Sequence, residues 1–91
     1  MFTSWGVETP KAFTMDELKA DLAALDDGEK YGAVLRAKGI VKGEGCWIHF
    51  DYVPGEPDIR DGGAMVTGRI CVIGSKLNEE AVAKLFGVEK Q

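Results

Sequence analysis

Cys46 and His49 are the two side chains whose types and spacing come nearest to a metal site in this sequence. Both are zinc ligands, and two residues separate them. The surrounding segment is rich in β-forming residues, and residues three apart on a strand point to opposite faces of the sheet. We therefore expect no zinc site from this pair. His49 and Asp51 would share a face, but two ligands are too few to hold a metal ion tightly without a partner chain.

Two further segments contain residue types that bind ions or nucleotides. Glu56, Asp58 and Asp61 supply carboxylates that suit a hard cation, but their spacing fits no EF-hand loop. The segment 68–76 ends like a phosphate-binding loop. Five residues separate its glycines where the motif requires four, and those residues are β-forming. We expect neither cation nor nucleotide binding from these segments.

A catalytic nucleophile is not supported by the sequence either. The chain has one histidine to activate a serine or cysteine, and Cys71 lies in an apolar run. Asp26 and Asp27 follow a predicted helix and are interpreted as loop charges, not as an acid and base pair. The sequence predicts that this chain is not an enzyme.

Strand alternation predicts a different kind of site, which is one exposed face of a β-sheet. Every second side chain of the β-rich segments is apolar and belongs under a covering helix. The other side would present Arg36, Lys38, Trp47, His49 and Arg69. A cationic, indole-bearing face can dock another domain, a partner protein or a stacked base, because Trp and Arg are favoured at binding hot spots. A solvated face whose charges only keep the protein in solution is the alternative.

Four β-rich segments, each bounded by Gly or Pro, predict the sheet that would position these side chains. They cover residues 2–8, 34–42, 46–53 and 65–73. Residues 43–45 predict a tight hairpin turn, and the acidic connection 54–63 has room for a short extra strand around residues 58–60. The side chains expected on the buried side are Leu35, Ala37, Val41, Cys46, Ile48, Phe50, Tyr52, Ile70 and Val72. Both cysteines are expected to be reduced and buried.

Two helices are predicted from their capping residues. Thr14 and Glu17 form a capping box before an apolar stripe, and Gly28 is expected to provide a left-handed exit from that helix. Asn78 is a favourable cap for a second helix, which Gly87 would end. The apolar residues at helical spacing are Met15, Leu18, Leu22 and Leu25 in the first helix and Val82, Leu85 and Phe86 in the second.

Length and element order predict the fold class. Ninety-one residues with 45% hydrophobic content suit one small domain with a single core. We predict one α+β domain in the order β-α-β-β-β-α. Its sheet would have four or five strands, mostly antiparallel, with two helices on one face. The strand order stays open, because this sequence of elements can be wound in more than one way.

The formal net charge of −4 argues against a dedicated nucleic-acid-binding protein, because binding to a phosphate backbone depends on basic patches. No apolar run approaches the roughly 20 residues that span a bilayer, and the N-terminus lacks a secretory pattern. We expect a cytoplasmic protein that has no membrane partner.

Three segments in order, LRAKG at 35–39, GRICVIG at 68–74 and LNEEA at 77–81, resemble the C-terminal domain of the CobW-like P-loop GTPases. The resemblance covers nearly all of residues 1–91. It implies that the chain is detached from an N-terminal GTPase domain, since no GTPase motif precedes these segments. Many relatives have a Trp shortly after the RAKG segment, where this chain has Val41 and Lys42.

The resemblance also implies a biological context. CobW-like proteins are thought to deliver cobalt, zinc or related metals, and some are linked to cobalamin synthesis. GTP, Mg²⁺ and the transition metal would belong to the parent protein, so no cofactor is expected in this chain. The expected partners are the parent's GTPase domain and a client protein that receives metal.

Two other functions remain as alternatives. The first is a free-standing sheet that binds a small ligand or nucleic acid through its open face. The second is a purely structural domain that completes the parent's fold or dimer.

Overall fold

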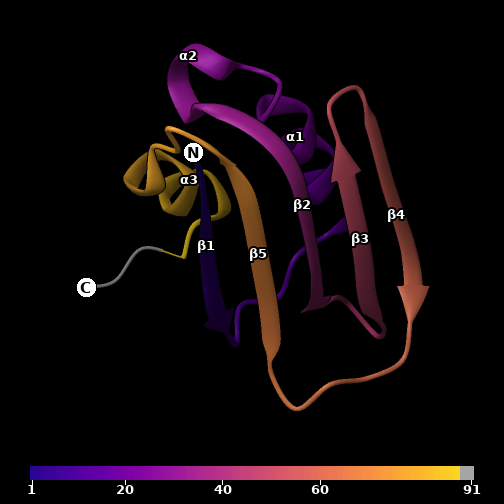
Figure 1. Cartoon of the computed structure of the whole chain (residues 1–91). Helices are drawn as coiled ribbons and strands as arrows, with labels where there is room; N and C mark the ends of the chain where they lie inside the picture. The colour runs from indigo at the N-terminus through magenta and orange to yellow at the C-terminus, as the bar shows by residue number, and fades with distance from the viewer. Residues whose placement is uncertain (89–91) are drawn as a thin grey trace.

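The chain folds into one antiparallel β-sheet that has helices on a single face (Figure 1). The computed structural model describes residues 1–88. The elements are β1 (Phe2–Thr9), α1 (Met15–Ala24), α2 (Gly28–Tyr31), β2 (Ala33–Lys42), β3 (Trp47–Val53), β4 (Glu56–Gly62), β5 (Gly68–Ser75) and α3 (Glu79–Phe86). The predicted α+β class and single-sided helix layer are confirmed. The sheet has the fifth strand that the sequence left open.

The last strand of the sheet is inserted between the first two. The strand order is β1-β5-β2-β3-β4, and every neighbouring pair is antiparallel. β1 and β2 therefore run parallel to each other, with β5 between them. The chain between β1 and β2 passes through α1, as parallel strands require a long crossover. This order brings residues far apart in sequence, on β2 and β5, next to each other at the centre of the sheet.

The caps of α1 and α3 follow the sequence prediction. The Thr14 hydroxyl accepts from the Glu17 amide at 3.0 Å, and the Glu17 side chain accepts from the Thr14 amide. At α3 the Asn78 side chain accepts from the Ala81 amide at 3.1 Å. Gly87 is left-handed with a φ of 70°, so that helix ends where it was expected to end.

The prediction for Gly28 was wrong. Its φ is not positive, and it begins a short helix, α2, that the sequence analysis did not predict. Asp27 explains this helix, because its side chain accepts from the amides of Glu29 and Lys30 at 3.1 and 3.3 Å. The left-handed glycine is Gly32, which follows α2 with a φ of 90°.

The core lies between the helices and one face of the sheet. Phe86 of α3 packs between the rings of Trp5 and Phe50, with centroid distances of 6.4 and 6.5 Å. The other fully buried residues include Leu18 and Leu22 of α1, Val41, Ile48, Ile70, Val72 and Val82. Figure 1 shows α1 and α3 behind the sheet, so the face toward the viewer is open.

Two strand boundaries differ from the prediction. β4 covers residues that were expected to form a loop with a short strand, and it pairs with β3 from Val53 opposite Glu56. A two-residue turn at Pro54 and Gly55 is enough to join them. The predicted strand at 65–73 instead begins at Gly68, because residues 63–67 are needed to cross below β3 and β2 from the edge of the sheet to its centre (Figure 1).

A β-bulge in β2 overturns the prediction that Leu35 is buried. Val34 pairs with Gly74 and Arg36 with Ile73, so Leu35 is an extra residue in the ladder. Alternation shifts by one position there. Val34 takes the buried place, and Leu35 is 44% exposed.

His49 of β3 fixes the start of the crossing loop. Its Nε2 lies 3.0 Å from the Gly63 carbonyl oxygen, to which it donates. The imidazole ring also lies against Gly62, where a Cβ would overlap ring atoms. A small residue at position 62 is therefore required by the position of His49.

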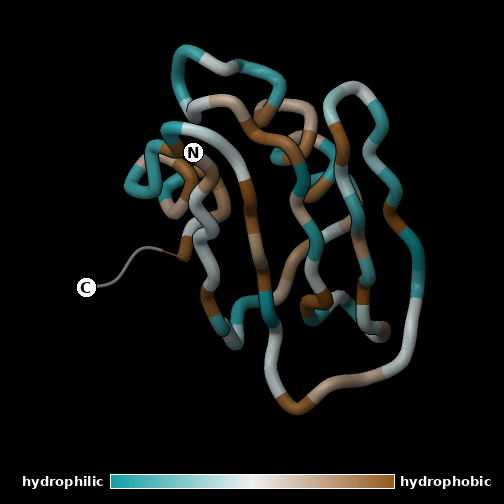
Figure 2. Tube along the Cα trace, in the orientation of Figure 1, coloured by the Kyte–Doolittle hydropathy of each residue, from teal (hydrophilic) through white to brown (hydrophobic). Residues whose placement is uncertain are grey.

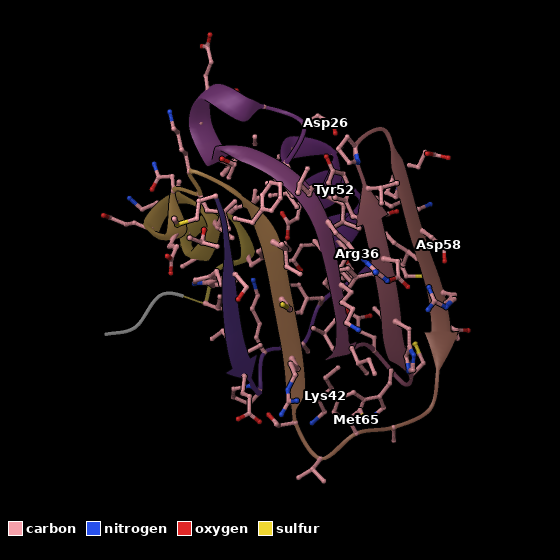
Figure 3. All side chains as sticks on the ribbon, viewed as in Figure 1. Asp26, Arg36, Lys42, Tyr52, Asp58 and Met65 are labelled. Carbon is pink, nitrogen blue, oxygen red and sulfur yellow. The ribbon has the colours of Figure 1, made fainter. Side chains whose placement is uncertain are left out.

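Asp26 and Tyr52 tie the end of α1 to the top of the sheet. The Tyr52 hydroxyl donates to the Asp26 carboxylate, which also accepts from the Gly55 amide at 3.2 Å. Burial and this hydrogen bond raise the pKa of Tyr52. Figure 3 shows the two side chains near the upper end of β3. Asp26 is thus a structural anchor, which corrects its interpretation as a loop charge.

No helix within residues 1–88 combines the length and the apolar run needed to cross a membrane.

The contact between His49 and Gly62 generates the first prediction. Gly62→Ala should lower the free energy of unfolding by about 1 to 2 kcal/mol, because His49 must move and lose its hydrogen bond. The matched control is Gly63→Ala, whose Cβ would meet no atom within 4 Å and should change stability by less than about 0.5 kcal/mol. Urea unfolding followed by tryptophan fluorescence measures both. If Gly62→Ala lowered the free energy of unfolding by the same amount in a His49→Ala background, this explanation would be wrong.

Asp21 generates the second prediction. It is 8% exposed on the buried side of α1, and its Oδ2 has no hydrogen-bond partner within the described part of the chain. Burial, reinforced by Glu17 and opposed by Lys11, raises the pKa of Asp21 to about 6. The folded state then keeps a proton that the unfolded state releases from about pH 4. The stability contributed by the protonated form is lost as the pH rises through 6.

Asp21→Asn removes this buried charge and should raise the free energy of unfolding at pH 7.5 by about 1 to 2 kcal/mol. At pH 4 the variant and the parent should be close to equal. Unfolding curves at several pH values between 4 and 7.5 provide the measurement. Parallel pH profiles for the two proteins would contradict the proposed role of Asp21.

Candidate functional site

All five residues predicted for the exposed surface lie on the open face of the sheet. Register places Arg36 beside Ile73, Ile40 between Arg69 and His49, and Lys42 beside Trp47. The buried residues Ala37, Val41, Ile48, Phe50, Tyr52, Ile70 and Val72 occupy the other face. We use the term open face for the outward side of β1 to β5, which bears Arg36, Lys38, Trp47, His49 and Arg69.

The cations of the open face are interleaved with carboxylates. Asp51 lies between two arginines, 3.5 Å from Arg36 and 3.0 Å from Arg60, and Arg60 also contacts Asp58 at 2.6 Å. Figure 3 shows Arg36 directed from β2 toward β3. Although partial burial acts in the opposite direction, hydrogen bonds from Arg60 and Arg36 hold the pKa of the Asp51 carboxyl below its usual value. The face is therefore less cationic than the sequence predicted.

Lys38 and Arg69 are less firmly paired than the arginines around Asp51. Lys38 lies directly opposite Asp51 in the register, yet within residues 1–88 its ammonium forms no salt bridge. Arg69 contacts Glu8 at 3.5 Å, and both side chains are about two-thirds exposed, at 68% and 60%. An exposed pair of this kind contributes at most about 1 kcal/mol. These two cations remain available to another molecule.

A shallow depression of about 460 Å³ occupies the middle of the open face. It brings together four of the five predicted residues, Arg36, Lys38, His49 and Arg69, and leaves out Trp47. Trp47 is half-buried beside Lys42 at the lower end of the sheet. Figure 3 shows Lys42 and Met65 at this lower end.

Ile40, Arg60, Met65 and Cys71 line the depression without having been predicted for the open face, and Asp51 was predicted only to share a face with His49. Alternation along the strands from Lys38 and Arg69 places Ile40 and Cys71 on the open face. Their apolar side chains favoured the buried face instead, so the sequence did not predict them for the site. Arg60 was missed because β4 was read mainly as a loop. Met65 was placed in a strand but lies in the crossing loop.

The cysteines do not match the expectation of burial. Cys46 and Cys71 are both partly exposed, free thiols, and Cys71 lies beside Lys38 on the open face. Within the described residues, no group of three or more His, Cys, Asp and Glu side chains is placed to hold a metal ion.

Exposed apolar side chains gather on the open face and along its lower border. Phe2, Leu35, Val53 and Ile73 are 64%, 44%, 41% and 37% exposed. Alternation along the strands directs the side chains of Phe2, Val53 and Ile73 to the open face, and the bulge directs Leu35 to the same face. The crossing loop adds Met65 and Val66, and the lowest part of that loop is strongly hydrophobic in Figure 2. Apart from Met1, these are all the large hydrophobic residues that are exposed in the described chain.

One comparison with known proteins identifies the family of this chain. The family described as "Cobalamin synthesis protein cobW C-terminal domain" matches residues 2–88. No curated protein matches the chain significantly.

Two similar solved structures are those of a Zn(II)-bound YjiA GTPase from E. coli and of a Zn(II)-bound triple mutant of YjiA. The identities are 23% and 22%, and the TM-scores are 0.74 and 0.76. Each alignment covers 98% of this chain but 30% of the other chain, so the similarity establishes the fold and this chain spans about a third of those proteins. Because the family match extends over almost every residue, the chain belongs to the CobW C-terminal domain family.

Proposed function

We propose that this chain is the non-catalytic C-terminal module of a CobW-like GTPase that delivers a metal such as cobalt or zinc. In this proposal the open face docks the nucleotide-binding domain or a client protein that receives the metal. The family match and the shared fold with a Zn(II)-bound GTPase support this assignment. The sequence contains no phosphate-binding loop, so nucleotide hydrolysis would belong to a separate domain. A role in cobalamin synthesis and a cytoplasmic location are consistent with the family and with two free thiols.

The observation that carries the docking proposal is the concentration of exposed apolar side chains on the open face. Exposed apolar residues scattered singly are normal on a soluble domain, but a contiguous group next to arginines indicates an interaction surface. Leu35 and Ile73 flank Arg36 at the upper part of the face, and Met65 borders the depression below. The helix side presents no comparable group within residues 1–88.

A free-standing module that binds a small ligand is the second candidate. The volume of the depression, about 460 Å³, is within the range of small-molecule sites, although the depression is shallow. Titration with GTP, single-stranded RNA or divalent metal ions, followed by the fluorescence of Trp5 and Trp47, separates the two functions. Saturation at micromolar ligand would favour the second.

Replacing Arg36 and Arg69 together with alanine tests the docking surface. Their ion pairs are exposed, so the free energy of unfolding should change by less than about 1 kcal/mol. Affinity for a separately expressed CobW-family nucleotide-binding domain, or for a metal-receiving client, should fall about tenfold or more because arginines are common hot spots. Calorimetric titration provides the measurement.

The matched control is the pair Lys19→Ala and Lys84→Ala, which removes two exposed cations from α1 and α3 on the opposite side. This variant should bind as the parent does. Equal affinities for all three proteins would show that the open face is not the docking surface.

A further inference from the structure

We infer that the open face receives an acidic protein segment that also carries apolar side chains, with its carboxylates placed at Lys38 and Arg69. This inference rests on the proposed docking function and specifies the chemistry of the docked partner. It follows from the charges that remain unsatisfied on the face and from their position relative to the exposed apolar residues.

The side chains that line the depression carry more positive than negative charge. Four cations line it, Arg36, Lys38, Arg60 and Arg69, with Asp51 as the one carboxylate. Asp51 already contacts both Arg36 and Arg60. Lys38 forms no salt bridge within the described chain, and the contact of Arg69 with Glu8 is exposed. The positive charge that is least compensated therefore lies between Lys38 and Arg69, and a partner carboxylate would bind most strongly there.

These two cations are close enough to share one carboxylate. Lys38 pairs with Cys71 and Ile40 pairs with Arg69 in the antiparallel ladder of β2 and β5. Lys38 and Arg69 are thus diagonal neighbours, which lie about 7 to 8 Å apart at their backbones. Ile40 and Cys71 complete the apolar floor between them.

The apolar residues define the other half of the footprint. Leu35 and Ile73 lie near Arg36, and Phe2 and Val53 extend this strip to both sides. From Arg36 to Ile40 the strand advances four residues, which is roughly 13 Å. A partner helix lying along the strands would cover this length with about nine residues. Its apolar side chains would contact the upper strip, and its carboxylates would contact the depression about two turns away.

The same arrangement argues against a nucleic acid as the partner. Glu8, Asp51 and Asp58 are interspersed among the cations and would repel a continuous phosphate backbone. Trp47, the indole expected to stack on a base, lies outside the depression.

The experiment uses a synthetic helical peptide of about 14 residues, with leucines along one side of its first half and glutamates along the same side of its second half. Heteronuclear NMR of the 91-residue chain locates binding by the shifts of backbone amides. Shifts are expected at residues 36–41 and 69–73. Affinity should fall with added salt, and a peptide with glutamine in place of glutamate should bind at least about tenfold more weakly.

Charge reversal at Lys38→Glu and Arg69→Glu should weaken peptide binding at least about tenfold. The matched control, Lys19→Glu with Lys84→Glu, makes the same change in net charge on the helix side and should have little effect. Equal loss in both variants, or equal binding of the glutamate and glutamine peptides, would overturn the inference. Tighter binding of single-stranded RNA than of the peptide to the same amides would also overturn it.

The outcomes distinguish this inference from the proposed function. If a nucleotide-binding domain or client binds the open face and Lys38→Glu with Arg69→Glu does not weaken it, docking stands and the acidic partner is wrong. If the peptide binds as expected while loss of Arg36 and Arg69 leaves binding of the domain and client unchanged, the face accepts acidic segments but does not dock those proteins.

Discussion

The insertion of β5 between β1 and β2 is the constraint on which the rest of this structure depends. Ile70 and Val72 of β5 are completely buried and lie at the centre of the helix-covered face. Alternation then forces Arg69, Cys71 and Ile73 to the other side. The neighbour relations between β2 and β5 at the candidate site follow from this position, namely Cys71 beside Lys38 and Arg69 beside Ile40. A sheet with β2 directly beside β1 would separate these side chains.

Local features of the fold could be predicted from the sequence, because they depend on residues close together in the chain. The capping box at Thr14 and the left-handed Gly87 are examples: both helices begin near the expected residues, and α3 also ends at the expected glycine. The open face was also predictable, since alternation sorts Arg36, Lys38 and His49 to one side without knowledge of strand order.

The remaining features depend on contacts between distant segments. The bulge at Leu35 lies where β2 pairs with β5, before its ladder with β3 begins at Ala37, and no pattern within β2 marks it. The start of β5 at Gly68 follows from the distance that the crossing loop must cover below two strands. The partners of Asp51 on β2 and β4 could not be predicted before β4 had been placed beside β3. The candidate site was therefore predicted as a set of residues, without its pairing or its depression.

The pairing around Asp51 determines how a partner can use this surface. Removing water from an ion pair costs free energy unless new hydrogen bonds replace those to water. The contacts of Asp51 with Arg36 and Arg60 are retained more easily at the rim of an interface than beneath its centre. Apolar contact at Leu35 and Ile73 carries no such cost. A partner carboxylate at Lys38 would replace the water around the ammonium group with a charge-assisted hydrogen bond. Paired charges, apolar residues and Lys38, which forms no salt bridge within residues 1–88, thus alternate on the open face, an arrangement that suits the negatively charged partner proposed above.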